Sequence, residues 1–154
     1  MVDIATASTV VATVSVIIGV IFTVLEVRHI SRTRRTDIIM RIYDRFGSRE
    51  MIDAVVKVGA AKYNSFDDYV NNYGTTDLLQ VALFFEGVGA LLEQDLIDIR
   101  MVDSLFAPNF SSLWGATRPL IEGIRKSAGQ QSMFSHFEYL YERLKAHRKE
   151  YKSE

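Results

Sequence analysis

The hydrophobic pattern divides the chain into one long apolar stretch and a series of shorter amphipathic segments. Residues 4–25 contain no Asp, Glu, Lys or Arg, and apolar side chains occupy every face of the helix that they would form. At a rise of about 1.5 Å per residue such a helix spans roughly 33 Å, against about 30 Å for the hydrocarbon core of a bilayer. The pattern therefore predicts a transmembrane anchor within residues 1–27. The basic residues follow this stretch rather than precede it, which favours an uncleaved anchor over a signal peptide.

Beyond the apolar stretch, apolar positions recur at intervals of three and four residues, as on one face of a helix, and no alternating run predicts a strand. The predicted helices cover 37–46, 48–59, 66–73, 77–94, 97–106, from 109 or 111 to about 128, and 132–149. The segment 77–94 is the most apolar of these. Its uncharged run of eight residues, 78–85, is too short to cross a bilayer, so it is predicted to be the buried central helix. Pro119 is expected to kink or restart its helix.

These patterns predict an all-α fold: a single N-terminal transmembrane helix that continues into a small cytoplasmic helical bundle. The expected division is a transmembrane anchor at 1–27, a basic juxtamembrane helix at 28–47 and a cytoplasmic helical domain at 48–154. An alternative remains open, in which the apolar stretch is the buried helix of a soluble helical oligomer. Its six Ser and Thr residues lower its hydrophobicity, but an all-round apolar helix of this length is hard to cover within 154 residues.

Charge is segregated along the chain, although the formal net charge is only −1. Residues 28–46 carry six arginines against two aspartates, residues 50–103 carry ten acids against three bases, and residues 118–152 carry eight bases against four acids. The near-zero total argues against a dedicated nucleic-acid binder. The chain has no cysteine, which excludes disulfides, thiolate zinc sites and cysteine nucleophiles. No cofactor or metal is expected.

A cluster of basic residues directly after the apolar stretch predicts its orientation. Lys and Arg near a membrane span stay on the cytoplasmic side, and the short segment before the span has none. We therefore expect the N-terminus outside the cell and the C-terminal domain in the cytoplasm, anchored in the cell membrane by one pass. The same side chains can attract anionic lipid headgroups or serve only as topology determinants. They are Arg28, Arg32, Arg34 and Arg35.

Small residues form a stripe along one side of the predicted span, at spacings of three and four. They are Ser8, Ala12, Ser15, Gly19 and Thr23. Membrane helices pack through such stripes because the two backbones can approach closely. The stripe predicts association with a second membrane helix, in a homo-oligomer or a larger membrane complex, while a lone anchor remains the alternative.

Glu86 lies within the most apolar cytoplasmic helix and is the main candidate for chemistry. A buried carboxylate is costly unless it is paired, so we expect an ion pair with Arg118 or Arg125. A functional carboxylate in a Glu/Arg pocket is the alternative. His136 has no partner at a known metal or catalytic spacing, and the glycines Gly87 and Gly89 are expected to allow close helix packing.

Several short motifs in a fixed order resemble the prokaryotic domain-of-unknown-function family 4760 over roughly residues 4–145. They are the N-terminal span with its arginines, Phe84-Phe85-Glu86-Gly87-Val88-Gly89, Leu96-Ile97-Asp98, Phe106, Trp114, Pro119-Leu120-Ile121, Arg125 and Phe137-Glu138-Tyr139-Leu140. The resemblance implies a small membrane-anchored helical protein of bacteria or archaea with no assigned activity. It supplies no catalytic residues.

Together these observations favour a non-enzymatic, membrane-anchored interaction protein, such as an accessory subunit, that associates through its transmembrane helix and its cytoplasmic bundle. The expected partners are membrane lipids and protein, and no nucleic acid. The alternative from another class is a membrane-bound enzyme or effector that uses Glu86 with Arg118 or Arg125 in a pocket.

Overall fold

The computed structural model describes residues 3–106 and 110–151, except for the side chains of residues 4–7, 10, 11, 29–34 and 151. Within these ranges the chain forms helices and no strand, which confirms the all-α prediction. The helices are α1 (Ile4–Phe46), α2 (Arg49–Ala60), α3 (Phe66–Tyr73), α4 (Thr76–Glu93), α5 (Ile99–Phe106), α6 (Phe110–Ala128) and α7 (Ser135–Tyr151).

Contacts between residues divide the chain into two units, 1–38 and 39–154. Helix α1 is continuous through the expected boundary between anchor and juxtamembrane helix, and its last two turns belong to the second unit. The reason lies in their side chains: Ile39 and Ile42 are buried, and the ring of Phe46 lies 4.8 Å from that of Phe106, centroid to centroid. The bundle therefore begins at residue 39, earlier than the expected residue 48.

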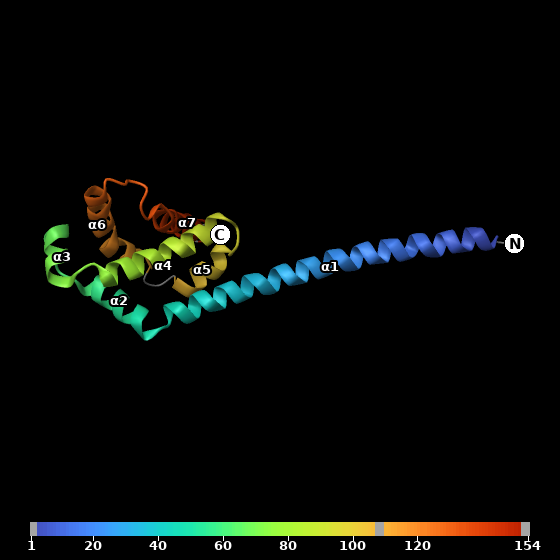
Figure 1. Cartoon of the computed structure of the whole chain (residues 1–154), viewed down its shortest axis with the longest axis horizontal. Helices are drawn as coiled ribbons and strands as arrows, with labels where there is room; N and C mark the ends of the chain where they lie inside the picture. Colours follow the sequence, from blue (N-terminus) through green and yellow to red (C-terminus); the bar gives the residue numbers. More distant parts are fainter. Residues whose placement is uncertain (1–2, 107–109, 152–154) are drawn as a thin grey trace. The chain divides into compact units, whose positions relative to one another are not determined.

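Helix α4 is the centre of the second unit, as its apolar pattern predicts. In Figure 1 it runs among the other helices of the bundle, and it contacts α7, α2 and α6. Its buried residues are Leu78, Val81, Ala82, Phe85, Val88, Gly89 and Leu92. These residues recur at intervals of three and four, so they form one buried face of the helix, while Leu83 on the opposite side is exposed.

An aromatic cluster fills the middle of the bundle. Phe85 of α4 lies 5.1 Å from Phe110 and 5.1 Å from Phe137, centroid to centroid. Phe137 in turn meets Trp114 edge to face at 4.9 Å, and Trp114 stacks on Tyr141 at 5.4 Å. Such pairs add to the stabilisation from burial alone. They join α4, α6 and α7 into one core.

Serine side chains cap the first turns of α2 and α3. The Ser48 hydroxyl accepts a hydrogen bond from the Met51 backbone N–H at 3.3 Å, and Ser65 does the same for Asp68 at 3.1 Å. Each satisfies one of the N–H groups left free in a first helical turn. Helix α6 continues through Pro119, so no new helix starts there, and residue 109 lies outside the described residues.

Over the part of the chain whose side chains are described, no single helix is both long and apolar enough to cross a membrane. The bent pair of α3 and α4, whose axes meet at 113°, satisfies the same criteria of length and composition. The buried core helix of a protein passes the same test, and one face of α4 is buried within the bundle.

Candidate functional site

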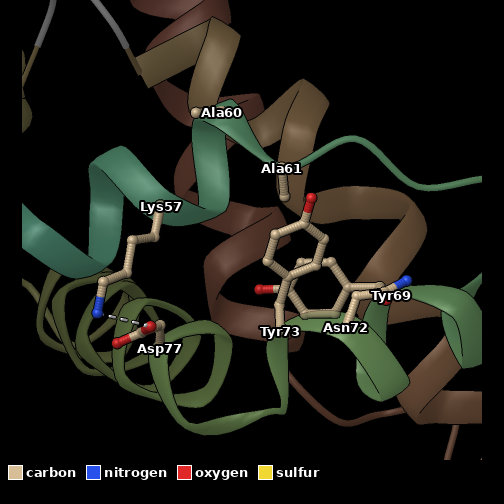
Figure 2. Close-up of a pocket in the computed structure, with 7 residues that line it drawn as sticks. All are labelled: Lys57, Ala60, Ala61, Tyr69, Asn72, Tyr73 and Asp77. Atoms are coloured by element: carbon tan, nitrogen blue, oxygen red, sulfur yellow. Dashed lines mark ion pairs between the residues drawn. The ribbon is translucent and has the colours of Figure 1, made fainter.

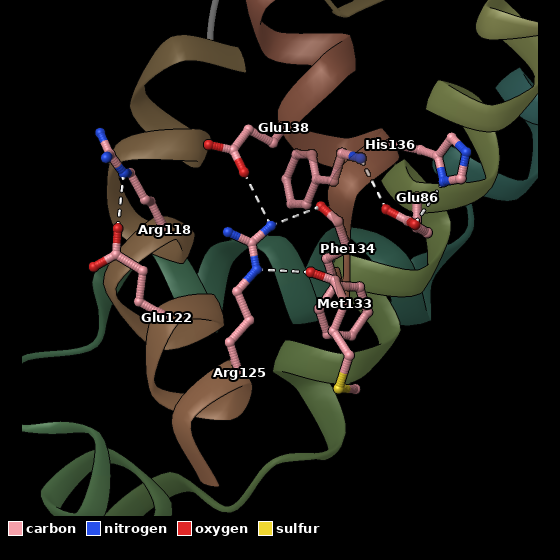
Figure 3. A network of polar contacts seen from close by, with 9 residues as sticks. Glu86, Arg118, Glu122, Arg125, Met133, Phe134, His136 and Glu138 are labelled. Carbon is pink, nitrogen blue, oxygen red and sulfur yellow. Dashed lines mark hydrogen bonds and ion pairs between the residues drawn. The ribbon is translucent and has the colours of Figure 1, made fainter. Parts of the chain in front are cut away.

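A polar network at the start of α7 holds the candidate residue Glu86 (Figure 3). One carboxylate oxygen of Glu86 contacts His136 Nδ1 at 2.8 Å, and the other accepts a hydrogen bond from the Phe137 backbone N–H at 2.8 Å. Phe137 lies in the first turn of α7, where backbone N–H groups have no partner within the helix. Glu86 of α4 thus acts as a cap for α7, and its negative charge lies at the positive end of that helix.

The residue that precedes α7 explains why a distant carboxylate is needed as the cap. Phe134 stands directly before the helix with a φ of 58°, and its side chain has no oxygen that could accept from the first turn. Its ring is buried instead. The sequence around the start of α7 therefore leaves the capping position open, and Glu86 supplies the missing acceptor from α4.

His136 is held between two carboxylates of the same helix. Its Nε2 lies 3.1 Å from Glu93 Oε2, while its Nδ1 contacts Glu86. Glu86 and Glu93 are seven residues apart, so they lie on one face of α4. Hydrogen bonding to Glu86, followed by the charges of Glu86 and Glu93, raises the pKa of His136 above its ordinary 6.5. The arrangement favours an imidazolium that donates through both ring nitrogens.

The close approach of α4 and α7 depends on Gly89. A Cβ atom built at Gly89 would overlap the backbone carbonyl of His136, whereas one built at Gly87 meets no atom within 4 Å. The expectation of close packing is therefore confirmed for Gly89. Gly87 has no neighbour that requires a glycine.

The two arginines expected to pair with Glu86 are engaged elsewhere. Arg125 donates to the carbonyl of Met133 at 2.8 Å and pairs with Glu138 at 2.9 Å. Arg118 pairs with Glu122, four residues on, at 3.0 Å. This corrects the expected partner: among the described contacts, Glu86 pairs with His136. Arg125 is the only one of the two that is largely buried, and it secures the turn that precedes α7.

The polar groups around Glu86 therefore have structural roles: Glu86 caps α7, and Arg125 holds the turn that precedes it. Two cavities among the described residues lie elsewhere, one near Tyr69 and one near Leu79. The described residues also contain no group of three or more His, Asp or Glu side chains arranged to hold a metal ion. Arg118 and Arg125 thus do not form the expected pocket with Glu86.

The candidate residues of α1 belong to the first unit and are described within that unit alone. All five members of the small-residue stripe are exposed. The Thr23 hydroxyl donates to the Gly19 carbonyl at 2.8 Å, which satisfies a polar group without a partner helix. Arg28 and Arg35 are exposed, and the side chains of Arg32 and Arg34 lie outside the described residues.

Two members of the network, His136 and Glu93, were not selected from the sequence. The signal that could have found them is the spacing of Glu86 and Glu93, which places both carboxylates on one face of a helix. A cationic partner on a neighbouring helix follows from that spacing. Which cation it is depends on the packing of α7.

In a comparison with known protein families, the family model with the description "Domain of unknown function (DUF4760)" matches residues 13–144. Neither the curated proteins nor the solved structures yielded a match to this chain.

Proposed function

The chain belongs to the DUF4760 family, and from this premise we propose that it is a membrane-anchored, non-enzymatic interaction protein. Residues 4–25 lie in the lipid bilayer, the arginines that follow lie at the cytoplasmic surface, and the helical bundle binds a protein partner in the cytoplasm. The anchor associates with a second membrane helix through its small-residue stripe.

One observation carries the proposal: the absence of charge over residues 4–25 combined with the exposure of the described apolar side chains there. Large apolar residues are exposed at nearly every position from 16 to 27, at 69% for Phe22. They point to all sides of the helix, because they occupy consecutive positions. An apolar surface on every side of a helix is costly in water and suits a bilayer.

The bundle supports an interaction role rather than catalysis. Its polar network serves the packing of α7, as argued above. Its exposed apolar residues include Ile52 and Val56, one turn apart on α2, and Leu83 on the neighbouring helix α4. Ile52 and Val56 share one exposed apolar face of α2, which is available to a protein partner.

Membrane fractionation tests the anchor. We expect the chain to stay with membranes through high-salt and alkaline washes and to be released by nonionic detergent. The double variant Ile17→Arg/Ile21→Arg places two charges within the span, at a cost of up to about 2.5–3.5 kcal/mol each, and should move the chain to the wash fraction. The matched variant Ile52→Arg/Val56→Arg changes exposed apolar residues of the bundle and should remain in the membrane. Release of the unaltered chain by salt alone would contradict the proposal and favour the soluble oligomer.

The absence of cysteine makes the orientation simple to test. In intact cells, a maleimide that cannot cross membranes should label Asp3→Cys and should label Ser104→Cys only after lysis. Ser104 is exposed on the bundle, so its labelling reports access and not burial. The reverse labelling pattern would mean that the bundle lies outside the cell.

Self-association through the stripe is tested with Ala12→Leu/Gly19→Leu against Val14→Leu. Larger side chains on the stripe keep the backbones apart, so the double variant should lose cross-linked dimers, while Val14→Leu, on the opposite side of the helix, should keep them. Equal cross-linking in all three chains would leave the bundle as the associating part. Purification in mild detergent then identifies what accompanies the chain, and in what ratio.

A further inference from the structure

A cavity of about 410 Å³ lies between α2, α3 and α4, and its lining shares no residue with the network around Glu86. This volume falls within the range of about 300–1,000 Å³ typical of small-molecule sites. Figure 2 shows two kinds of side chain around it: the Tyr69 and Tyr73 rings with Ala61 on one side, and Lys57 and Asp77 directed toward one another on the other. The site therefore has an aromatic wall and a charged wall.

The groups fixed in this cavity suit a cation. Asn72 donates its amide nitrogen to Asp68, through the carbonyl at 2.9 Å and the carboxylate at 2.8 Å, so what its side chain can still offer is an acceptor oxygen. The Tyr73 hydroxyl is engaged with the Lys62 backbone at 3.3 Å. Its ring is left as the contact surface, and the face of an aromatic ring attracts cations.

The negative charge of Asp77 reaches the aromatic wall. Burial raises the pKa of Tyr69, and the charges of Asp77 and then of the neighbouring tyrosines raise it further. The Tyr69 and Tyr73 rings lie 5.3 Å apart, centroid to centroid. The carboxylate and the two rings thus act on the same space.

Lys57 is the one basic group that lines the cavity, and it already acts as a cation there. Its ammonium lies 3.2 Å from the Asp77 carboxylate, yet the Lys57 side chain is 64% exposed, against 29% for Asp77. Exposed ion pairs of this kind contribute little to stability. The lysine can swing into water at small cost, while the carboxylate stays at the wall.

We propose that this cavity binds a small organic ammonium ion, which lies against the Tyr73 ring and pairs with Asp77 in place of Lys57. The local charge agrees, because residues 50–103 carry ten acids against three bases and so attract cations. The site lies within residues 57–77 and does not depend on the membrane anchor.

Calorimetric titration of the full-length chain in nonionic detergent and an amine-free phosphate buffer tests the proposal. The probes are benzylammonium, benzyl alcohol and benzoate, which share a ring and differ in charge. Benzylammonium should bind saturably with one site per chain, benzyl alcohol about tenfold more weakly, since charged hydrogen bonds are the stronger ones, and benzoate not measurably. A benzoate affinity equal to or above that of benzylammonium, or no saturable binding of benzylammonium, would overturn the proposal.

The ion pair provides a sharper test, because its two members should have opposite effects. Asp77→Asn should weaken benzylammonium binding about tenfold. Lys57→Gln removes the internal competitor and should strengthen binding about threefold. A merely structural ion pair would give the same sign for both variants, and that result would contradict the competition between Lys57 and the ligand.

Two controls guard against loss of fold and against a general effect of charge. Asp67→Asn removes an exposed carboxylate of α3 that does not line the cavity, and it should leave the affinity unchanged. If Asp77→Asn loses helical content by circular dichroism, its weaker binding is not informative. The affinity of Lys57→Gln then tests the proposal, since tighter binding cannot arise from unfolding. Unchanged or weaker binding in Lys57→Gln would count against the proposal.

Discussion

Helix α4 and the first part of α1 are both strongly apolar, but they satisfy that apolarity in different ways. In α4 one face of apolar side chains is buried in the bundle, where the helix contacts α2, α6 and α7, and its one interior carboxylate, Glu86, caps another helix. In residues 12–28 of α1 the described side chains are exposed. Hydrophobicity alone therefore does not tell whether a helix is covered by other helices. The paired carboxylate of Glu86 and the contacts of α4 do.

The largest contrast is expected between two phenylalanines. Phe137 is fully buried against Phe85 and Trp114, whereas Phe22 of α1 is 69% exposed. Phe137→Ala should lower the free energy of unfolding by about 3–5 kcal/mol because it leaves a cavity, and Phe22→Ala should change it by less than about 0.5 kcal/mol. Urea unfolding of the full chain in detergent, followed by circular dichroism, measures both. A loss for Phe22→Ala as large as for Phe137→Ala would mean that this segment is a packed core helix.

A second contrast compares two glycines of α4, two residues apart. Gly89→Ala should cost about 3 kcal/mol, the upper end for overpacking, because the new Cβ would overlap the His136 backbone, which cannot rotate away. Gly87→Ala meets no atom within 4 Å and should stabilise α4 by about 0.5–1 kcal/mol through its better helix propensity. The same urea titration distinguishes them. If both variants were stabilised, α7 would not approach α4 as closely as the structure has it.

The arginines provide a third contrast within one helix. Arg125 is 14% exposed, bonds to the carbonyls of Met133 and Phe134, and pairs with Glu138. Arg125→Ala should cost about 2 kcal/mol, since it removes a charged donor from the part-buried Met133 carbonyl and the ion pair with Glu138. Arg118→Ala removes only a pair whose side chains are 59% and 48% exposed and should cost less than about 0.5 kcal/mol. Equal effects would show that Arg125 does not secure the turn before α7.

The sequence predicted most of the helices because their signals are local. Ser48 and the apolar spacing after it predict α2, and the apolar run around Phe85 predicts the central place of α4. The partner of Glu86 was predicted wrongly because it depends on features that no local pattern displays: the left-handed turn at Phe134 and the contact of Gly89 with the His136 backbone. The cavity beside Tyr73 was not predicted either, since three separate helices form its walls.

The smallest effect expected is a pH dependence that distinguishes the paired charge of α4 from an ordinary surface charge. Because the pKa of His136 is raised in the folded chain above its ordinary 6.5, the imidazolium stabilises the fold fully below about pH 6.5. This contribution is lost as the pH rises through the higher folded pKa.

His136 is 36% exposed, so solvent screening keeps its contribution below about 1 kcal/mol. The urea midpoint of the unaltered chain should therefore fall, relative to that of His136→Gln, as the pH rises above about 6.5. Glu86→Gln removes the largest cause of the raised pKa and should move this fall to lower pH, whereas Glu122→Gln, whose carboxylate pairs with Arg118 instead, should leave it in place. If the urea midpoint of His136→Gln fell with pH as much as that of the unaltered chain, the pH dependence would belong to another group, and Glu86 would be a simple helix cap.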